Sequence, residues 1–402
     1  MTPPWPEACD GPRIPAAQGG AAGILPTRGG APRVPHAGGG VARGADGQYE
    51  RFGLVLMLTH ACNMRCTYCY GGEKSNRRMA PAYGRAGIDR AIASLTPGGT
   101  LELGFFGGEP LLEAKLALGL TAYARRRAAR RGVTVEVGVT TNGTVAGPAA
   151  WRLLTDPEVD VAVSHDGLPA VHDAHRVTAD GRGTSEAVRA TLRRLRAAGK
   201  SFSVVMVVRP DTVGHLSSGV EYHRCIGIRH MEPSLDLWTV WTADDLARLA
   251  REIHKCALLW RDALPDFSLS WFDEKAALLA CLPQAPTARC GFGAGQMAVA
   301  PSGRLYPCER LISSDAANNA ARLPGHVADG GDFLSVPAAP CRSAPACSRC
   351  SVADLCNTTC RCSNYVRTGD PTQPDRLLCA LNRMCLDETA NVLTEVAEAC
   401  PA

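Results

Sequence analysis

Three cysteines stand close together with the spacing of a ligand set: three residues separate Cys62 from Cys66, and two separate Cys66 from Cys69. They follow the apolar run 54–59, so we expect them on a loop at the end of a strand. Three thiolates can hold three irons of a cubane cluster and leave the fourth iron open to a small molecule. A structural zinc site is the less favoured alternative, because it needs a fourth ligand and His60 is poorly placed to supply one.

The elements that would position this loop alternate along the chain. Strand-like runs occur at 54–59, 101–106, 133–141, 159–164, 202–208 and 228–235, with helix-like segments at 80–95, 111–131, 149–154, 184–198 and 243–264. This alternation predicts an α/β fold with a parallel sheet and right-handed crossovers. The segment is too short for a closed eight-unit barrel, so we expect a partial (β/α)6 TIM-like barrel with its chemistry at the carboxyl ends of the strands.

The composition divides the chain into three parts. Residues 1–48 are rich in Gly and Pro and predict a disordered tail, and residues 49–265 carry the barrel pattern. Residues 266–402 hold most of the cysteines and show little periodicity before a closing helix at about 375–399. We therefore expect a small C-terminal domain that is organised by metal rather than by an apolar core.

Charge and hydropathy give no sign of a nucleic-acid or membrane partner. The 402 residues include 18 cysteines and carry a formal net charge of +4, which gives no reason to expect nucleic acid or a membrane surface. No apolar run approaches the roughly 20 residues of a membrane span, and the N-terminus does not resemble a signal peptide. We expect a cytoplasmic protein with reduced thiols, in which Cys225 and Cys256 are buried and the arginines of 125–131 face solvent.

The three-cysteine motif resembles that of the radical S-adenosylmethionine (SAM) enzymes. The resemblance implies that Cys62, Cys66 and Cys69 hold a [4Fe-4S] cluster whose open iron chelates SAM. Reduction by one electron would then release a 5'-deoxyadenosyl radical, which abstracts a hydrogen from the substrate. Tyr68 would lie against the adenine, and its alternative role is packing at the strand end.

Further positions that resemble SAM contacts of this family fall at or after the ends of the next three strands: Gly107, Gly108, Glu109, Thr141, Asn142, Ser164 and Arg176. Glycines permit close backbone approach, and the Glu109 carboxylate can hold the methionine ammonium. Thr141 and Asn142 resemble ribose or carboxylate contacts, and Arg176 a contact to the SAM carboxylate. His165 stands where the family has an apolar residue, and we interpret it as a tolerated departure.

The C-terminal cysteines resemble the SPASM domain, in which seven cysteines carry auxiliary [4Fe-4S] clusters, giving three clusters in all. The resemblance assigns one set to the first auxiliary cluster, Cys290, Cys308 and Cys360, and another to the second, Cys347, Cys350, Cys356 and Cys379. Cys281 is the favoured fourth ligand of the first cluster, and an open iron or Cys341 is the alternative. Cys362 or Cys385 can also replace a neighbour in these sets.

Glu309 directly follows Cys308. In the sulfatase-maturing branch of the family, an Asp at the corresponding place accepts a proton when the substrate radical is oxidised. The resemblance makes Glu309 the candidate catalytic base, and pairing with Arg310 or Arg304 is the alternative.

The two resemblances together imply a maturase of ribosomally made peptides. It would abstract a hydrogen from a precursor peptide and form a thioether or carbon–carbon crosslink while an auxiliary cluster accepts the remaining electron. The alternatives are oxidation of Cys or Ser to formylglycine on a sulfatase, and a non-catalytic iron–sulfur scaffold. The expected partners are a peptide or protein substrate and an electron donor such as flavodoxin or ferredoxin. The 48-residue tail is too short for a winged-helix peptide binder, so we expect peptide recognition elsewhere.

Overall fold

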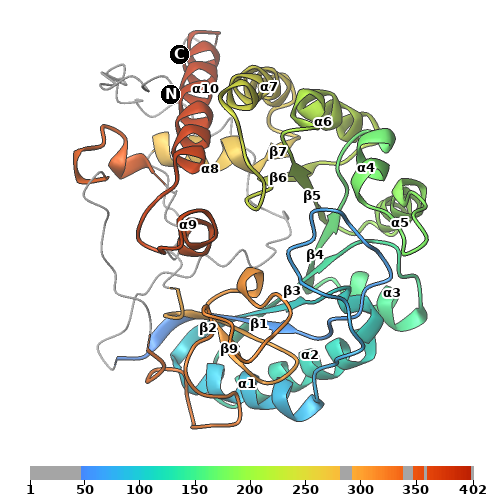
Figure 1. The fold of residues 1–402 in the computed structure, drawn as a ribbon, viewed down its shortest axis with the longest axis vertical. Coiled ribbons are helices and arrows are strands. Elements are labelled where there is room, and N and C mark those ends of the chain that lie inside the picture. The colour runs from blue at the N-terminus through green and yellow to red at the C-terminus, as the bar shows by residue number, and fades with distance from the viewer. Residues whose placement is uncertain (1–46, 281–291, 338–346, 357–359, 400–402) are drawn as a thin grey trace.

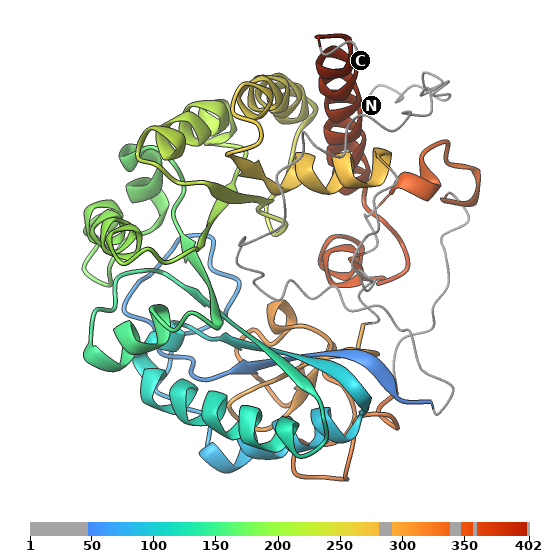
Figure 2. The same ribbon diagram turned by 180° about the vertical axis from the view of Figure 1, so that it is seen from behind.

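The computed structural model describes residues 47–280, 292–337, 347–356 and 360–399. Nine strands form one sheet in the order β7-β6-β5-β4-β3-β2-β1-β8-β9, and neighbouring strands are parallel except β8 and β9. The sheet curves into an open ring with the helices that follow its strands around the outside (Figure 1). The same arrangement is visible from behind in Figure 2.

The strands of the sheet are β1 (Tyr49–Met57), β2 (Leu95–Phe106), β3 (Thr134–Thr141), β4 (Val159–Ser164), β5 (Ser203–Val208), β6 (His230–Leu235), β7 (Ser268–Leu269), β8 (Gln296–Val299) and β9 (Leu305–Tyr306). The α-helices are α1 (Pro81–Ala93), α2 (Ala114–Ala129), α3 (Pro148–Leu154), α4 (Pro169–His175), α5 (Ser185–Ala197), α6 (Leu216–Cys225), α7 (Ala243–Arg261), α8 (Ser270–Leu279), α9 (Arg361–Thr368) and α10 (Arg376–Ala399). Short 3-10 turns are η2 (Pro110–Glu113), η3 (Val213–His215), η4 (Glu309–Leu311), η5 (Cys347–Arg349) and η6 (Ala353–Leu355).

Local sequence explains where many of these elements begin. Pro81, Pro148 and Pro169 stand in the first turn of α1, α3 and α4, where the missing N–H of proline costs no hydrogen bond. Thr242 caps α7 in a reciprocal capping box with Asp245. The central strands are buried on both faces, as β4 shows with five of its six residues buried. The predicted α/β partial barrel is confirmed, with β1 to β6 at the six predicted strands.

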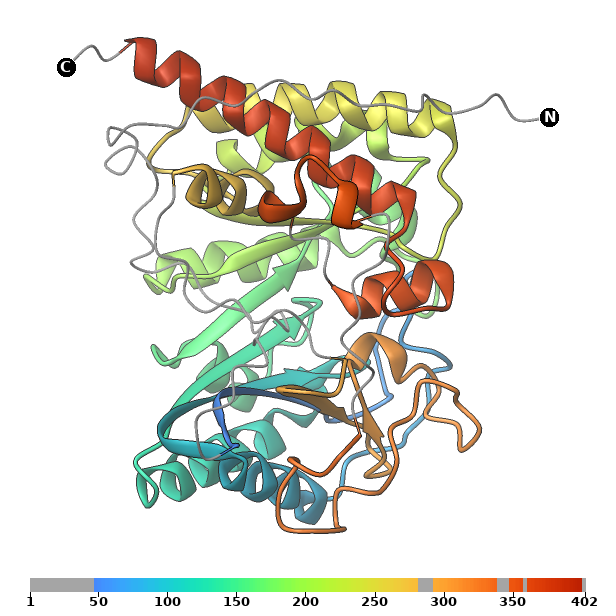
Figure 3. The same ribbon diagram turned by 90° about the vertical axis from the view of Figure 1, so that its left-hand side faces the viewer.

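The sheet also extends beyond the predicted strands. β7 pairs with β6 at one edge, and β8 pairs in parallel with β1 at the other, so segments from beyond residue 265 continue the barrel sheet at both ends. Helices α4, α6, α8 and α9 were not among the predicted segments, whereas α10 matches the expected closing helix and packs against α7 and α8. The side view shows α10 lying across these helices (Figure 3). The boundary at residues 265 and 266 stays a prediction.

The two cysteines expected to be buried differ in the structure. Cys256 is buried in α7, but Cys225 is exposed, so its prediction was wrong. Cys225 is the last residue of α6, where the helix end turns toward solvent. The arginines of α2 do face outward, and Arg125 and Arg127 pair with Asp156 and Asp89.

Two further expectations concern the chain ends and membranes. Almost all of the expected tail, residues 1–46, lies outside the described residues. Within the described ranges, no helix is both long enough and apolar enough to cross a bilayer.

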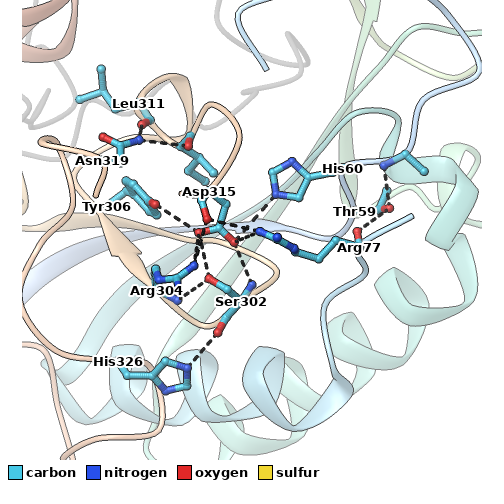
Figure 4. Close-up of polar contacts among 12 residues, drawn as sticks. Thr59, His60, Arg77, Ser302, Arg304, Tyr306, Leu311, Asp315, Asn319 and His326 are labelled. Atoms are coloured by element: carbon cyan, nitrogen blue, oxygen red, sulfur yellow. Dashed lines mark hydrogen bonds and ion pairs between the residues drawn. The ribbon is translucent and has the colours of Figure 1, made fainter. Parts of the chain in front are cut away.

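A buried carboxylate organises the hairpin of β8 and β9. Asp315 accepts hydrogen bonds from the Ser302 hydroxyl at 2.9 Å and from the Tyr306 hydroxyl at 3.1 Å, and the Arg304 guanidinium donates to its backbone carbonyl at 2.9 Å (Figure 4). The Asp315 side chain is fully buried. Its backbone has φ 55°, in the left-handed region that Asp tolerates better than most residues.

The same carboxylate reaches the segment that carries the three cysteines. Arg77 donates to Asp315 at 3.3 Å, and the buried His60 ring lies 3.9 Å from it (Figure 4). Nearby, Gly72 packs so closely on the Ser313–Ser314 backbone that a Cβ would meet the Ser314 nitrogen at 2.4 Å. The hairpin and the cysteine loop are therefore fixed to each other.

Asp315→Asn should lower the free energy of unfolding by about 1–3 kcal/mol, because it removes a buried charge while leaving its donors in place. Burial alone would raise the pKa of Asp315, but His60, Ser302 and Tyr306 lower it to about 2. The stabilisation is therefore present above the usual carboxyl pKa and is lost as pH falls toward 2. Urea unfolding at pH 7 measures the effect.

Asp329→Asn is the matched control, because Asp329 is an exposed carboxylate in the same region. Equal unfolding midpoints for Asp315→Asn and wild type would contradict the organising role of Asp315.

Candidate active site

The three-cysteine loop follows β1 directly and is held along the segment after α4. The Arg65 amide donates to the Val177 carbonyl at 2.7 Å, and the Thr67 amide donates to the His175 carbonyl at 3.0 Å. The Thr67 hydroxyl also lies 2.7 Å from Nδ1 of His175. These contacts fix the loop at the carboxyl edge of the sheet, where the barrel fold predicts the chemistry.

The thiols of this loop face hydrogen-bond donors. Lys74 Nζ lies 2.9 Å from Cys69 Sγ, and the side-chain Nδ2 of Asn142 lies 3.8 Å from Cys62 Sγ. Burial raises the pKa of Cys62, and it raises that of Cys66 to about 11 although Arg176 opposes the effect. The donors suit the loop to hold thiolates once a metal replaces their protons.

The three thiols of the loop lie near one another, since those of Cys62 and Cys69 both raise the pKa of Cys66. In the described ranges, no three His, Cys, Asp or Glu side chains are grouped so as to hold one metal ion. Each thiolate of a cubane binds a different iron, so the three sulfurs need not converge on one point. The donor set of Cys62, Cys66 and Cys69 therefore suits an iron–sulfur cluster.

Glu109 is fully buried between the ends of β2 and β3. Its carboxylate accepts hydrogen bonds from the backbone amide of Asn142 at 2.7 Å, the Thr141 hydroxyl at 2.8 Å and the backbone amide of Leu111 at 2.9 Å. Burial raises the pKa of Glu109 to about 7, although these three hydrogen bonds lower it. A carboxylate offers about four lone pairs, so one acceptor position stays open to a further donor.

Gly107 and Gly108 serve a close backbone approach within the protein itself. A Cβ at Gly107 would lie 2.7 Å from the Thr59 carbonyl oxygen, and one at Gly108 would lie 2.2 Å from that of Ala61. The Gly108 amide also donates to the Thr59 carbonyl at 2.8 Å, and the Glu109 amide donates to the Ala61 carbonyl at 2.9 Å. The glycines thus seat the start of the cysteine loop on the end of β2.

Asp166 joins two of the predicted SAM-contacting residues. Its carboxylate accepts from the Tyr68 hydroxyl and from Arg176 Nε, the latter at 2.9 Å, and its other oxygen accepts from the Val207 amide at 3.0 Å. Arg176 also lies over the Tyr68 ring, 5.3 Å from its centroid. Ser164 is nearby at the end of β4 and is nearly buried. The structure therefore brings Tyr68 and Arg176 together through a buried carboxylate.

Three histidines are buried behind Asp166. His165 Nδ1 lies 3.0 Å from His223 Nε2, and His165 Nε2 lies 3.1 Å from the Ser185 hydroxyl. Burial lowers the pKa of His165 and His172 to about 2 and that of His223 to about 4. His165 is therefore neutral and internally hydrogen-bonded, which agrees with its interpretation as a tolerated departure.

The second predicted cysteine set gathers around the start of α10. Burial raises the pKa of Cys379 to about 11, and the thiols of Cys356, Cys347 and Cys350 contribute in the same direction because they lie close by. Arg383 Nη2 lies 3.2 Å from Cys350 Sγ. The four thiols assigned to one auxiliary cluster therefore share one region, with a cation beside them.

Of the first predicted set, Cys308 and Cys360 lie within the described residues, whereas Cys281, Cys290 and the alternative Cys341 lie outside them. Arg310 donates weakly to the Ser363 hydroxyl at 3.5 Å, and that hydroxyl donates to Cys360 Sγ at 3.2 Å. Cys362 lies beside Cys360 and lowers its pKa.

Glu309 contacts Cys308, and of the two alternative arginine partners Arg310 lies close enough to interact with its charge. The Cys308 thiol donates to Glu309 at 3.3 Å, and Arg304 pairs with Asp315 instead. The carboxylate is only half-buried. Glu309 is thus placed beside a predicted cluster ligand, and its role as a base stays a prediction.

The sequence reasoning passed over Asp166, Lys74 and Tyr70. Asp166 had a signal, because it is the third residue of the Ser-His-Asp-Gly run at the end of the fourth strand. Lys74 and Tyr70 had none beyond their nearness to Cys69, since which side chain meets a thiol depends on how the loop folds back.

SAM affinity should rise with pH between about 6 and 7.5, because the carboxyl of Glu109 loses its proton near its raised pKa of about 7 and then attracts the ammonium. Glu109→Gln should weaken binding by about tenfold or more and flatten this pH dependence. Equilibrium dialysis of SAM against the unreduced, cluster-loaded protein checks both. The same pH profile in the variant and in wild type would remove Glu109 from SAM binding.

A family model and several curated proteins match the chain. Residues 56–217 match the model of the Radical SAM superfamily. The serine-type anaerobic sulfatase-maturating enzyme of Klebsiella aerogenes is 28% identical over 285 residues, 65% of this chain and 67% of that enzyme. PqqA peptide cyclase of Streptomyces rochei is 24% identical over 349 residues, 80% of this chain and 88% of that protein.

Two solved structures share the fold. The structure of anSMEcpe with bound AdoMet and a peptide has a TM-score of 0.71 at 17% identity, covering 87% of this chain and 99% of that one. Streptococcus suis SuiB bound to its precursor peptide SuiA has a TM-score of 0.56 at 13% identity, covering 82% and 76%. Motif, fold and family model agree, and the chain therefore carries a radical SAM domain and is a radical SAM enzyme.

Proposed function

We propose that this enzyme oxidises a peptide by two electrons and so closes a thioether or carbon–carbon crosslink in a ribosomally made precursor. Its site would hold a SAM-binding cluster on Cys62, Cys66 and Cys69 and two auxiliary clusters on the C-terminal cysteines. The observation that carries the proposal is the coupling of two predicted cluster segments through Asp315. Arg77, which follows the three-cysteine loop, and Ser302 of the β8–β9 hairpin, which precedes Cys308, both donate to its carboxylate.

Different residues of the chain would bind SAM and orient it. When bound, SAM and its cluster supply a 5'-deoxyadenosyl radical that takes a hydrogen atom from the peptide. Tyr68 and Arg176, held by Asp166, would orient SAM, and Glu109 would bind its ammonium. Holding both reactants in line and away from water is the larger part of the protein's contribution.

The proton released in the second half of the oxidation needs an acceptor near the auxiliary cluster. Glu309 is the candidate, because its carboxylate contacts Cys308 and is only half-buried. A flavodoxin or ferredoxin would deliver the starting electron.

A second product is supported by the relatives. The sulfatase-maturating enzymes match about two thirds of this chain, which favours oxidation of Cys or Ser to formylglycine as the alternative. PqqA peptide cyclase and SuiB with its precursor peptide support the crosslinking product. Both products begin with abstraction of a hydrogen from the peptide and the loss of a second electron and a proton. They differ in whether another group of the peptide then bonds to the oxidised carbon.

The test is anaerobic incubation of the reconstituted protein with SAM, dithionite and two sets of peptides. One set carries sulfatase maturation sequences with Cys or Ser, and the other is encoded by short reading frames beside this gene. We expect 5'-deoxyadenosine together with a peptide that has lost hydrogen, and neither product from Cys66→Ala. An aldehyde trapped by a hydrazide reagent identifies formylglycine, and its absence with a loss of two hydrogens identifies a crosslink.

Cys225→Ala is the matched control, because Cys225 is an exposed cysteine outside the predicted ligand sets. Wild-type protein with full iron content that makes no 5'-deoxyadenosine would leave only the scaffold alternative standing.

A further inference from the structure

Three aromatic rings form a stack that the proposed chemistry does not use. Phe106 is the last residue of β2, Tyr70 follows Cys69, and Trp238 lies in the loop after β6. The Tyr70 and Trp238 ring centroids are 4.6 Å apart with 10° between the planes, and those of Tyr70 and Phe106 are 6.1 Å apart with 9°. This aromatic stack joins the cysteine loop to strands from distant parts of the barrel.

The outer member of the stack faces solvent. Trp238 is 46% exposed, and Val240 in the same loop is 80% exposed. Across the described residues, the third large exposed apolar side chain is Leu112, at 41%. Two of three such side chains thus belong to one short loop, and grouped apolar exposure of this kind marks binding surfaces.

The loop that carries Trp238 is held on both sides. On the barrel side, Asp236 pairs with Arg209 and accepts from the Trp238 amide at 3.0 Å. On the other side, Arg367 of α9 donates to the carbonyls of Leu237 at 3.0 Å and Thr239 at 2.8 Å. An exposed ring whose backbone is already fixed loses little freedom when a ligand covers it, so it is preorganised for binding.

The position of the stack indicates what covers it. Tyr70 lies beside Glu309, Cys308 and Cys69, which together with burial raise its pKa although Arg310 opposes them. The loop itself carries no charged residue from 237 to 241. A peptide that reaches the space between the two predicted cluster segments would therefore pass an uncharged aromatic surface, which suits an apolar or aromatic side chain.

We propose that Trp238, supported by Tyr70 and Phe106, is the docking platform for an apolar or aromatic side chain of the substrate peptide next to the residue attacked. The proposal rests on the proposed action on a peptide and adds a specificity-determining residue to it. Buried Trp and Tyr anchors carry a large share of the affinity of peptide and protein interfaces.

The test measures binding without turnover, on the full chain with clusters and SAM present but without reductant. The probes are dye-labelled synthetic peptides of one Cys-containing sequence, with Phe, Leu or Asp on either side of the Cys, followed by fluorescence anisotropy. Wild type should bind a Phe or Leu peptide at least about tenfold more tightly than the Asp peptide. Trp238→Ala should lose this preference, Trp238→Phe should keep most of it, and the matched control Leu112→Ala should leave it unchanged.

Circular dichroism and SAM cleavage without peptide should be equal in Trp238→Ala and wild type, which excludes misfolding. Unchanged affinity and preference in Trp238→Ala, or no binding of any probe to wild type, would overturn the platform. A preference that depends on Trp238 without any change in the peptide on reduction would leave the platform standing and reject the proposed function instead.

Discussion

The buried Asp315 carboxylate is the interaction on which the rest of the site depends. It receives donors from the β8–β9 hairpin and from Arg77, so two segments more than 200 residues apart in the sequence meet at one charge. A buried carboxylate without these donors would be strongly unfavourable, which makes the arrangement close to all-or-none. Because Asp315 joins the hairpin that precedes Cys308 to Arg77, which follows the three-cysteine loop, the separation of these two segments is set by the fold.

Two further buried carboxylates repeat this principle at the sheet edge. Glu109 ties the end of β2 to that of β3, and Asp166 ties the end of β4 to Tyr68 and Arg176. In each case the carboxylate fixes groups that would contact SAM before SAM arrives. Such preorganisation lowers the cost of aligning cofactor and substrate, which matters in a reaction whose chemistry is supplied mainly by the cofactor.

The sequence sufficed for the parts that depend on local pattern. Six strands follow from short apolar runs, and the cysteine loop and Glu109 follow from their places just after two of them. The sequence did not indicate which distant segments pair, because no local pattern shows that β8 pairs with β1 or that Asp315 contacts Arg77. Helix α8 was missed because it is short and lies in a region without periodicity, and Cys225 was misplaced because its helix ends at the surface.

Hydrogen abstraction from the peptide is tested most directly by following the hydrogen that leaves it. A peptide that the enzyme converts is prepared with deuterium at every carbon of its reactive residue, and the 5'-deoxyadenosine is analysed by mass spectrometry. If the 5'-deoxyadenosyl radical takes its hydrogen from the peptide, 5'-deoxyadenosine will gain deuterium in proportion to the peptide converted. Conversion of the peptide with 5'-deoxyadenosine that stays free of deuterium would contradict it.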